Sequence, residues 1–262
     1  MNRLLITIDQ LNRLTDTETT LMDVVEHFHA QGGQIDLFTR LVEGTYLRRL
    51  KALQRSGNVQ CFMEDEHPLA AHYDLIWICQ GYMSLKMISA LQKGEISGVC
   101  IFQHYYAYAD QDLPYGAALE NKLAAYSLAV SALSYAKLAL KGIDQRKLHL
   151  FPLSVSDSFA QVQPQAMPPL SRILLISEEQ NDAIGELRTL LAAKGISLDH
   201  INARRREVEL TPEFLSTYQL VMAQTRPVVQ ALAAGVPVYL TDTVSGAGYV
   251  NGETLEAGLD SH

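Results

Sequence analysis

The chain has 262 residues, of which 48% are hydrophobic and 19% are charged, and its formal net charge is −8. This size and composition suit one large or two modest folded domains and exclude a disordered chain. The acidic balance argues against nonspecific binding to nucleic acid, and no apolar run approaches the ~18 residues of a membrane-spanning helix. The cysteines lie in apolar runs, as reduced core thiols do, and too few apolar residues precede Asp9 for a signal peptide. These features predict a cytoplasmic protein.

Short apolar runs alternate with helical patterns through the first half of the chain. Strands are predicted at Arg3–Ile8, Ile35–Phe38, Val59–Met63, Leu75–Cys79, Gly98–Phe102, Tyr126–Val130 and Lys147–Phe151. Helices are predicted at Glu18–Gln31, Tyr46–Arg55, Tyr82–Lys93, Tyr115–Ala125 and Leu133–Lys141. The strand runs are continuously apolar rather than alternating, which is typical of a parallel sheet covered by helices on both faces.

The proline-containing stretch Ser154–Leu170 lacks periodicity and is predicted to be a linker, after which the same alternation resumes. Strands are predicted at Arg172–Ile176, Leu198–Ile201, Leu220–Ala223 and Val236–Leu240, and helices at Asp182–Lys194, Thr211–Thr217 and Pro227–Ala234. We therefore predict an α/β protein with two Rossmann-like domains, residues 1–160 and 161–262. In such proteins ligands bind at the carboxyl ends of the strands, in the cleft between domains.

Two segments of the second domain are candidates for binding an anion. Ser245, Gly246, Ala247 and Gly248 follow a predicted strand, and their backbone N–H groups could form a nest for a phosphate; the alternative is an ordinary tight turn. Thr225 and Arg226 open a predicted helix, whose amino terminus carries a partial positive charge. Because arginine can bond a phosphate bidentately, this pair is a candidate diphosphate clamp, with a capped surface helix as the alternative.

In the first domain, His104 and Tyr105 directly follow a buried strand. Imidazole and phenol groups at such a position can hydrogen-bond sugar hydroxyls and stack on sugar rings. The alternative is a histidine with a purely structural role. The D-x-D of Asp110 and Asp112 lies in a long loop and is interpreted as solvated rather than as a metal site.

Other common signatures of cofactor chemistry are missing from the sequence. No H-E-x-x-H, C-x-x-C or G-x-S-x-G occurs, and no G-x-G-x-x-G follows the first strand. We therefore predict neither a metal nor an organic cofactor. The basic helix over residues 47–55 either rests on anionic lipid at the membrane surface or simply presents a solvated face.

Four segments resemble bacterial GT-B glycosyltransferases of the retaining, family 4 kind that build surface polysaccharides. In the second half these are SRILLISEEQ and LTPEFLSTYQLVMAQTRPVVQALAAGVPVYLTDTVSGAGYV, and in the first half SGVCIFQHYYAY and AVSALSYAKLALKGIDQRKLHLFPLSVSD. The resemblance implies a GT-B fold, with the donor held by the second domain. It also implies a role for His104 near the reacting sugar, and an acceptor site that includes Tyr105 and the loop containing Asp9, Asn12 and Arg13.

The sequence also departs from that family. The loop after the first strand has no glycine, and the position of the basic pair that holds the diphosphate is taken by residues 177–180, SEEQ. The two family glutamates are replaced by Met222 and Gln230, and the chain ends at His262 before the expected last elements, so the second domain is predicted to be incomplete.

The resemblance implies that the protein transfers a sugar from a nucleotide-diphosphate donor to a carbohydrate or lipid-linked acceptor, without a metal and with retention. Two alternatives stay open. One is a catalytically degenerate scaffold that acts as the partner of another transferase, which the departures favour. The other is a sugar-nucleotide epimerase, for which only His104 and Asp9 offer suitable side chains. A transferase and an epimerase should both bind a nucleotide, whereas a scaffold need not.

Overall fold

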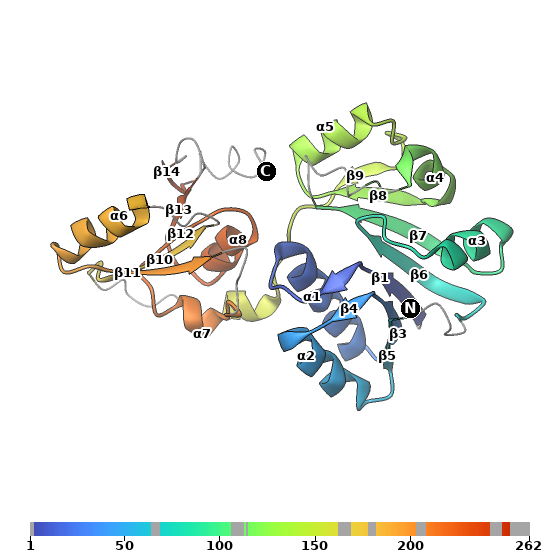
Figure 1. Cartoon of the computed structure of the whole chain (residues 1–262), viewed down its shortest axis with the longest axis horizontal. Helices are drawn as coiled ribbons and strands as arrows, with labels where there is room; N and C mark the ends of the chain where they lie inside the picture. The colour runs from blue at the N-terminus through green and yellow to red at the C-terminus, as the bar shows by residue number, and fades with distance from the viewer. Residues whose placement is uncertain are drawn as a thin grey trace. The chain divides into compact units, whose positions relative to one another are not determined.

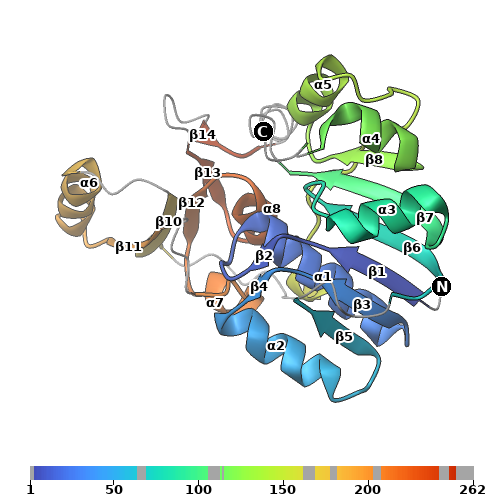
Figure 2. The same cartoon turned by 45° about the vertical axis from the view of Figure 1, so that its right-hand side comes forward.

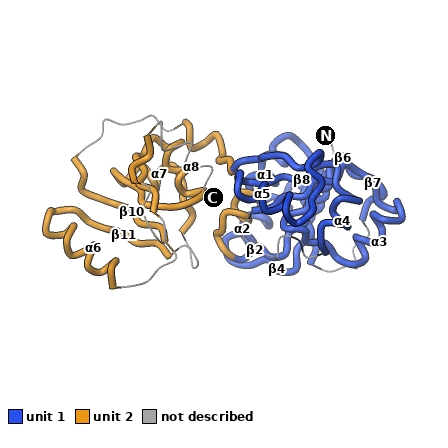
Figure 3. Tube along the Cα trace, turned by 90° about the horizontal axis from the view of Figure 1, so that it is seen from above, with its two compact units in different colours: residues 1–12, 21–152, 261–262 blue, residues 13–20, 153–260 orange. Residues whose placement is uncertain are grey.

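The protein is described by a computed structural model covering residues 3–63, 69–105, 113, 115–161, 169–177, 182–202, 208–241 and 248–251. The chain divides into two compact units (Figure 3). The first contains the described residues of 1–12 and 21–152, and the second contains those of 13–20 and 153–260. The boundary predicted between residues 160 and 161 lies inside the second unit.

The first unit is built on a seven-stranded sheet in the order β5-β3-β1-β6-β7-β8-β9, with every pairing parallel. Figure 2 shows this order running from β8 near the top to β5 at the bottom. The strands are β1 Arg3–Thr7, β3 Gln34–Phe38, β5 Val59–Phe62, β6 His72–Cys79, β7 Ser97–His104, β8 Tyr126–Ala129 and β9 Leu148–Leu150. The predicted α/β class with parallel sheets is confirmed, because these continuously apolar strands are buried under helices.

Helices connect the strands of this sheet (Figure 1). They are α1 Asp16–Ala30, of which residues 16–20 belong to the second unit, α2 Gly44–Gln54, α3 Leu85–Lys93, α4 Gly116–Leu123 and α5 Ala132–Leu140. Residues of α3 and α4 pack on one face of the sheet around Ile76, Ile78 and Phe102. The sequence did not predict the two-residue strands β2 Gln10–Leu11 and β4 Leu41–Val42, which pair with each other outside the main sheet. Strands this short carry no periodic signal.

The second unit has a five-stranded sheet in the order β11-β10-β12-β13-β14, in which only β14 is antiparallel. Its strands are β10 Arg172–Ser177, β11 Ser197–Asn202, β12 Leu220–Ala223, β13 Val238–Leu240 and β14 Gly248–Tyr249. Its helices are α6 Asp182–Ala192, α7 Pro212–Leu215 and α8 Arg226–Ala233. Leucines of α6 pack on one face of the sheet, and α7 and α8 contribute to a separate core cluster.

Part of the segment predicted to be a linker belongs to this second core. Residues Asp157–Gln161 form a 3-10 helix, and the side chain of Phe159 is buried against the cluster that contains Leu174 and Val228. The prediction of an unstructured linker over Ser154–Leu170 is wrong for these residues. A single anchoring aromatic produces no hydrophobic period, so the sequence pattern could not reveal it.

A polar triad centred on the buried Asp36 ties together three strands of the first unit. Arg3 Nη2 donates to Asp36 Oδ2 at 3.0 Å, and Tyr73 Oη donates to the same oxygen at 2.7 Å. The guanidinium also lies 5.5 Å from the centre of the Tyr73 ring. Burial raises the pKa of the Tyr73 phenol, which therefore stays protonated and remains a donor.

The second unit repeats this triad at equivalent positions. Arg172 Nη2 and Tyr218 Oη both donate to Asp199 Oδ2, at 2.9 and 3.0 Å, and the guanidinium lies 4.7 Å from the Tyr218 ring centre. The strand register is also the same, since Leu5 pairs with Asp36 in the first unit and Leu174 pairs with Asp199 in the second. The two units are therefore variations on one strand-and-helix plan, down to the polar contacts at the start of the sheet.

The two triads differ in burial, and this difference leads to a prediction. The Asp36 side chain is 5% exposed, whereas that of Asp199 is 47% exposed. We expect Asp36→Asn to lower the free energy of unfolding by about 2 kcal/mol, because it weakens one buried and one partly buried hydrogen bond to a charged group. Asp199→Asn should cost less than about 1 kcal/mol, because solvent screens the exposed pair.

Urea unfolding followed by tryptophan fluorescence would measure this effect. The only tryptophan, Trp77, is buried in β6 and donates to Gln103 Oε1 at 2.8 Å, so it reports the first unit. Asp36→Asn should move the fluorescence midpoint, and Asp199→Asn should leave it in place. An equal shift in both variants would show that the triads do not stabilise their own units.

Candidate functional site

The turn between β12 and α8 holds its backbone in an unusual conformation. Thr225 has φ of 53° and ψ of −134°, which is disfavoured for a β-branched residue, and such strain tends to occur at functional sites. α8 begins at the next residue, with Pro227 in its first turn, where no N–H donor is needed. The sequence thus places a rigid, strained turn at the carboxyl end of a parallel strand.

The first unit contains the equivalent turn. Gln80 follows β6 and also has φ of 53°. Leu75 pairs with Leu4 of the first strand, just as Leu220 pairs with Ile173 of β10, and the interval from Leu75 to Gln80 equals that from Leu220 to Thr225. In both units a non-glycine residue with φ of 53° therefore follows the equivalent strand, β6 or β12, which the sequence alone did not indicate.

An oxyanion already lies at the amino terminus of α8. Within the second unit, Thr225 Oγ1 donates to Asp16 Oδ2, and the backbone N–H of Arg226 donates to the same oxygen at 3.2 Å. The N–H groups of a helix start have no partner inside the helix, and the helix dipole favours a negative charge there. The turn is therefore a working oxyanion site, filled in this structure by a carboxylate of the chain itself.

The predicted clamp residue Arg226 lies beneath this site. Its side chain is fully buried, and its Nη1 donates to Thr20 Oγ1. A guanidinium remains charged at every physiological pH, so it adds a positive charge in a poorly solvated place close to the start of α8. Sequence reasoning selected Thr225 and Arg226 but missed Asp16, whose signal was an acidic residue in the first turn of α1.

Of the remaining predicted donor residues, the structure describes only Gly248. Ser245, Gly246 and Ala247 fall outside the described residues. Gly248 begins β14, where it pairs with Leu240 of β13. Its φ of +94° is a conformation that residues with a side chain rarely adopt, so glycine is required there by the backbone.

His104, the last residue of β7, is fully buried and forms part of a polar cluster. Its Nε2 lies 2.9 Å from Glu120 Oε1, and Ser127 Oγ donates to the same carboxylate oxygen at 2.5 Å. Glu120 comes from α4 and Ser127 from β8, and both are buried. Tyr105 is also buried, rather than presented at the surface for ring stacking. The sequence did not single out Glu120, which is an acidic residue on an ordinary helical pattern.

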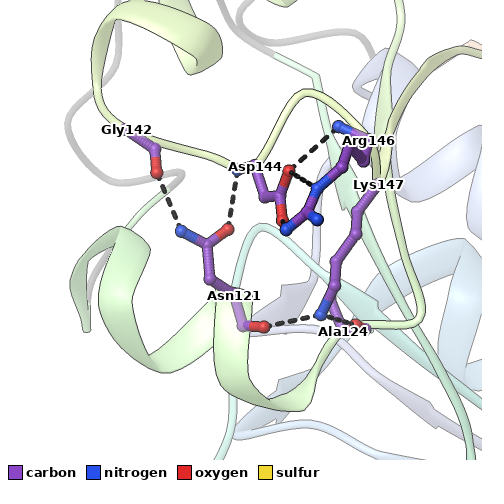
Figure 4. Close-up of polar contacts among 6 residues, drawn as sticks. All are labelled: Asn121, Ala124, Gly142, Asp144, Arg146 and Lys147. Carbon is purple, nitrogen blue, oxygen red and sulfur yellow. Dashed lines mark hydrogen bonds and ion pairs between the residues drawn. The ribbon is translucent and has the colours of Figure 1, made fainter.

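The end of α4 is held in place by polar contacts with the segment after α5 (Figure 4). The amide of Asn121 donates to Gly142 O and accepts from the N–H of Asp144, both at 2.8 Å. Lys147 Nζ donates to the carbonyls of Asn121 and Ala124, at 2.6 and 2.8 Å. A cation bonded to the last carbonyls stabilises a helix end, so the helix that carries Glu120 has a fixed position.

Glu120 also lines a small pocket in the first unit. The pocket is lined by Gly81, Met83, Phe102, Leu113, Tyr115, Gly116, Leu119 and Glu120. Tyr115 Oη donates to Met83 O at 2.5 Å and so joins the start of α4 to the loop that follows β6. The strained turn at Gln80 and the His104 cluster thus share one neighbourhood at the carboxyl edge of the sheet.

The other predicted acceptor residues follow β1. The carboxylate of Asp9 forms an ion pair with Arg40, with Nη2 to Oδ2 at 2.7 Å. Asn12 Nδ2 donates to Gln10 Oε1 at 3.3 Å, and the exposed Arg13 donates its backbone N–H to Glu18 Oε2 at 2.9 Å. Asp9 and Asn12 belong to the first unit and Arg13 to the second.

Two further features bear on metals and membranes. In the part of the chain that the structure describes, no three His, Cys, Asp or Glu side chains gather in a way that could hold a metal ion, and Asp110 and Asp112 lie outside that part. Among the helices within the described ranges, none is both long and apolar enough to span a bilayer. On α2, Arg48 and Lys51 are exposed, while Arg49 is paired with Glu26 at 2.8 Å. Contact of residues 47–55 with a membrane stays a prediction.

The comparisons with known proteins define a fold. No family model and no curated protein matches the chain. Solved structures do match: HepE of Anabaena in complex with UDP-glucose has a TM-score of 0.57 at 13% identity, covering 92% of this chain and 80% of that one. A glycosyltransferase of Rickettsia africae has a TM-score of 0.57 at 11% identity over 92% and 79% of the two chains. A UDP-N-acetylglucosamine 2-epimerase has a TM-score of 0.53 at 9% identity over 94% and 80%.

The chain therefore has the α/β fold of GT-B glycosyltransferase structures. The solved structure of the epimerase is similar to this chain as well. At these identities the likeness establishes architecture alone, and function must be argued from the sites.

The strain at Thr225 can be tested by comparing two substitutions. Thr225→Gly and Thr225→Val both remove the hydroxyl that donates to Asp16, but only glycine adopts this backbone conformation without strain. We expect the glycine variant to be more stable than the valine variant by about 1–3 kcal/mol. The thermal midpoint, together with amide hydrogen exchange in β12 and α8, would measure the difference.

Thr189 in α6 is a matched control, because it is exposed on an ordinary helix. There the order should reverse, since glycine is the poorer helix former. If valine were the better residue at both positions, the conformation at Thr225 would carry no strain.

Proposed function

We propose that the protein binds a nucleotide-diphosphate sugar through the start of α8 and transfers the sugar to a carbohydrate or lipid-linked acceptor. The observation that carries this proposal is the oxyanion held by Thr225 and the N–H of Arg226. The hydroxyl of the strained Thr225 and the backbone N–H of Arg226 both donate to a single carboxylate oxygen, and the Arg226 side chain that follows is buried. A phosphate oxygen has the same hydrogen-bonding demands and a larger charge, so a diphosphate suits the place that Asp16 occupies.

The fold supports the choice of ligand. HepE has the same architecture and was solved in complex with UDP-glucose, and other matching structures are glycosyltransferases or an epimerase of a UDP-sugar. In the proposal, Ser245, Gly246, Ala247 and Gly248 complete the donor site with backbone N–H groups. His104 and Tyr105, with Asp9, Asn12 and Arg13, serve the reacting sugar and the acceptor.

The proposed transfer proceeds with retention and without a metal. The leaving diphosphate gains one negative charge as the bond between the anomeric carbon of the sugar and the β-phosphate oxygen breaks, and catalysis consists largely of stabilising that charge. The start of α8 and the guanidinium of Arg226 supply a positive potential where a divalent cation would otherwise be needed.

A binding panel with UDP, GDP, CDP, ADP and their common sugar conjugates tests the donor site. In wild-type protein the Asp16 carboxylate competes with the diphosphate for the same donors. Asp16→Asn keeps the shape of the side chain but removes its charge, so we expect the preferred nucleotide to bind about tenfold more tightly. Calorimetry would give the affinities, and the thermal midpoint without nucleotide should fall slightly because a helix start loses its anion.

Asp182→Asn is the matched control, because Asp182 is an exposed acidic residue in the first turn of α6. This variant should leave nucleotide affinity unchanged. Nucleotide binding that is indifferent to the charge of Asp16 would place the diphosphate elsewhere, and silence of both proteins across the whole panel would overturn the proposed function.

Metal removal tests the second part of the proposal. Transfer measured by nucleotide release should keep its rate within about twofold after treatment with EDTA, because protein groups supply the positive potential. Thermal unfolding in EDTA controls for general damage. A large loss restored by Mg²⁺ or Mn²⁺ would instead assign a metal to the donor, with Asp110 and Asp112 as the first ligands to test.

One observation favours a second candidate function. The Asp16 carboxylate fills the oxyanion site, as expected for a scaffold that has exchanged its donor for an internal anion. Such a scaffold would bind no nucleotide in the panel above even as Asp16→Asn. An epimerase would bind a UDP-sugar and convert it with no acceptor present, which distinguishes it from a transferase.

A further inference from the structure

His104, Glu120 and Ser127 form a buried polar cluster in the first unit. The three side chains come from three different elements, β7, α4 and β8, and none is more than 3% exposed. Polar groups are costly to bury unless their hydrogen bonds are satisfied, so the position of each proton in this cluster matters.

The hydrogen-bond geometry determines where these protons lie. Ser127 Oγ donates to Glu120 Oε1 at 2.5 Å, and His104 Nε2 lies 2.9 Å from that same oxygen. Glu120 Oε1 accepts from Ser127, and an oxygen that acts as the acceptor for both neighbours leaves the hydrogen between His104 and Glu120 on the imidazole Nε2. A neutral imidazole with its hydrogen on Nε2 carries a lone pair on Nδ1.

The other ring nitrogen has no visible partner. His104 Nδ1 is buried, and none of the residues in the described ranges forms a hydrogen bond with it. A buried acceptor without a hydrogen-bond partner lowers the stability of the protein. A donor that reaches it restores that stability without breaking an existing hydrogen bond of the protein. Nδ1 is therefore an acceptor prepared for a donor that comes from outside the described structure.

We propose that Glu120 is a positioning residue: it holds His104 as the Nε2–H tautomer, so that Nδ1 accepts a hydrogen bond from a hydroxyl group of the bound sugar. This inference deepens the proposed function and rests on it for the identity of the ligand. A sugar hydroxyl is a neutral donor, which suits a bare lone pair. Because His104 is fully covered in the structure, the hydroxyl must displace whatever covers the ring.

The surroundings of Glu120 are suited to such a role. Contacts of Asn121 and Lys147 with the segment after α5 hold the end of α4, and the contact of Tyr115 with Met83 holds its start. A carboxylate on a helix fixed at both ends can orient an imidazole more sharply than one on a loop. The pocket beside Glu120, lined in part by Gly81 and Met83, leaves space next to the cluster.

Nitrogen-15 NMR of the imidazole rings measures the tautomer directly, without a ligand and without activity. The sequence has 8 histidines, and His104→Gln would identify the signal of His104 by its loss. We expect wild-type His104 to show a protonated Nε2 and a bare Nδ1 near neutral pH. A hydrogen on Nδ1 in the wild-type protein would overturn the proposal.

Three variants distinguish a positioning role of Glu120 from a role in packing alone. Glu120→Leu cannot accept a hydrogen bond and should release the single tautomer, whereas Glu120→Gln keeps a carbonyl oxygen and should largely restore it. Ser127→Ala removes the other donor to the same oxygen and should leave the His104 tautomer unchanged. If the leucine variant kept the Nε2–H tautomer, or if the alanine variant lost it equally, Glu120 would not be the group that sets it. Should the leucine variant fail to fold, the wild-type and glutamine spectra still decide the point.

The ligand is tested by adding UDP and UDP-sugar separately to labelled protein. The Nδ1 signal should shift with the sugar conjugate, alone or with an acceptor sugar, but not with UDP.

Turnover of Glu120→Leu should fall about tenfold, the worth of roughly one hydrogen bond, while KM for the donor stays the same. A UDP-sugar that binds by calorimetry yet leaves Nδ1 unmoved would assign that nitrogen to a buried water and overturn the hydroxyl contact. If no nucleotide binds, the proposed function is wrong. The NMR result on the His104 tautomer still tests the role of Glu120, because it needs no ligand.

Discussion

Parallel pairing of buried strands is the constraint on which the rest of this protein depends. Parallel strands bring all their carboxyl ends to one edge of the sheet, and the connecting helices cover the faces. In the first unit that edge carries Asp9 and Gln80, which follow β1 and β6, and His104, which ends β7. In the second unit it carries Thr225 and the start of α8. The polar chemistry gathers at this edge because the faces of both sheets are apolar core.

The two units share the same local features within this arrangement of strands. Each places an Arg–Asp–Tyr triad at the start of three neighbouring strands, and in each a residue with positive φ follows the strand that begins at the tyrosine end of the triad, β6 or β12. They differ in the element that follows the strained turn. In the second unit α8 begins at once and its first N–H, that of Arg226, donates to an oxyanion. In the first unit Gly81–Met83 separate Gln80 from the Ser84 cap of α3. The oxyanion site therefore belongs to the second unit.

Positive charge at the start of α8 comes from local geometry. The chain carries a net charge of −8, yet the start of α8 combines a helix dipole with the buried Arg226. Local geometry can thus create a positive potential in an acidic protein. The Asp16 carboxylate accepts hydrogen bonds from two partly buried donors there, the Thr225 hydroxyl and the Arg226 N–H.

The sequence by itself determined the alternation of strands and helices, the α/β class and the choice of Thr225, Arg226 and His104 as candidates. These follow from local properties, namely apolar runs, helix starts and residues just beyond a strand, which neighbouring residues along the chain decide. Only the tertiary structure decided what those candidates contact. Asp16 reaches Thr225 from far away in the sequence, and Glu120 reaches His104 from a separate helix. Neither pairing leaves a trace in periodicity or spacing, because hydrogen bonds between distant segments depend on how the strands are ordered in the sheet. The burial of Phe159 escaped the sequence for the same reason, since a single side chain becomes core only when other segments surround it.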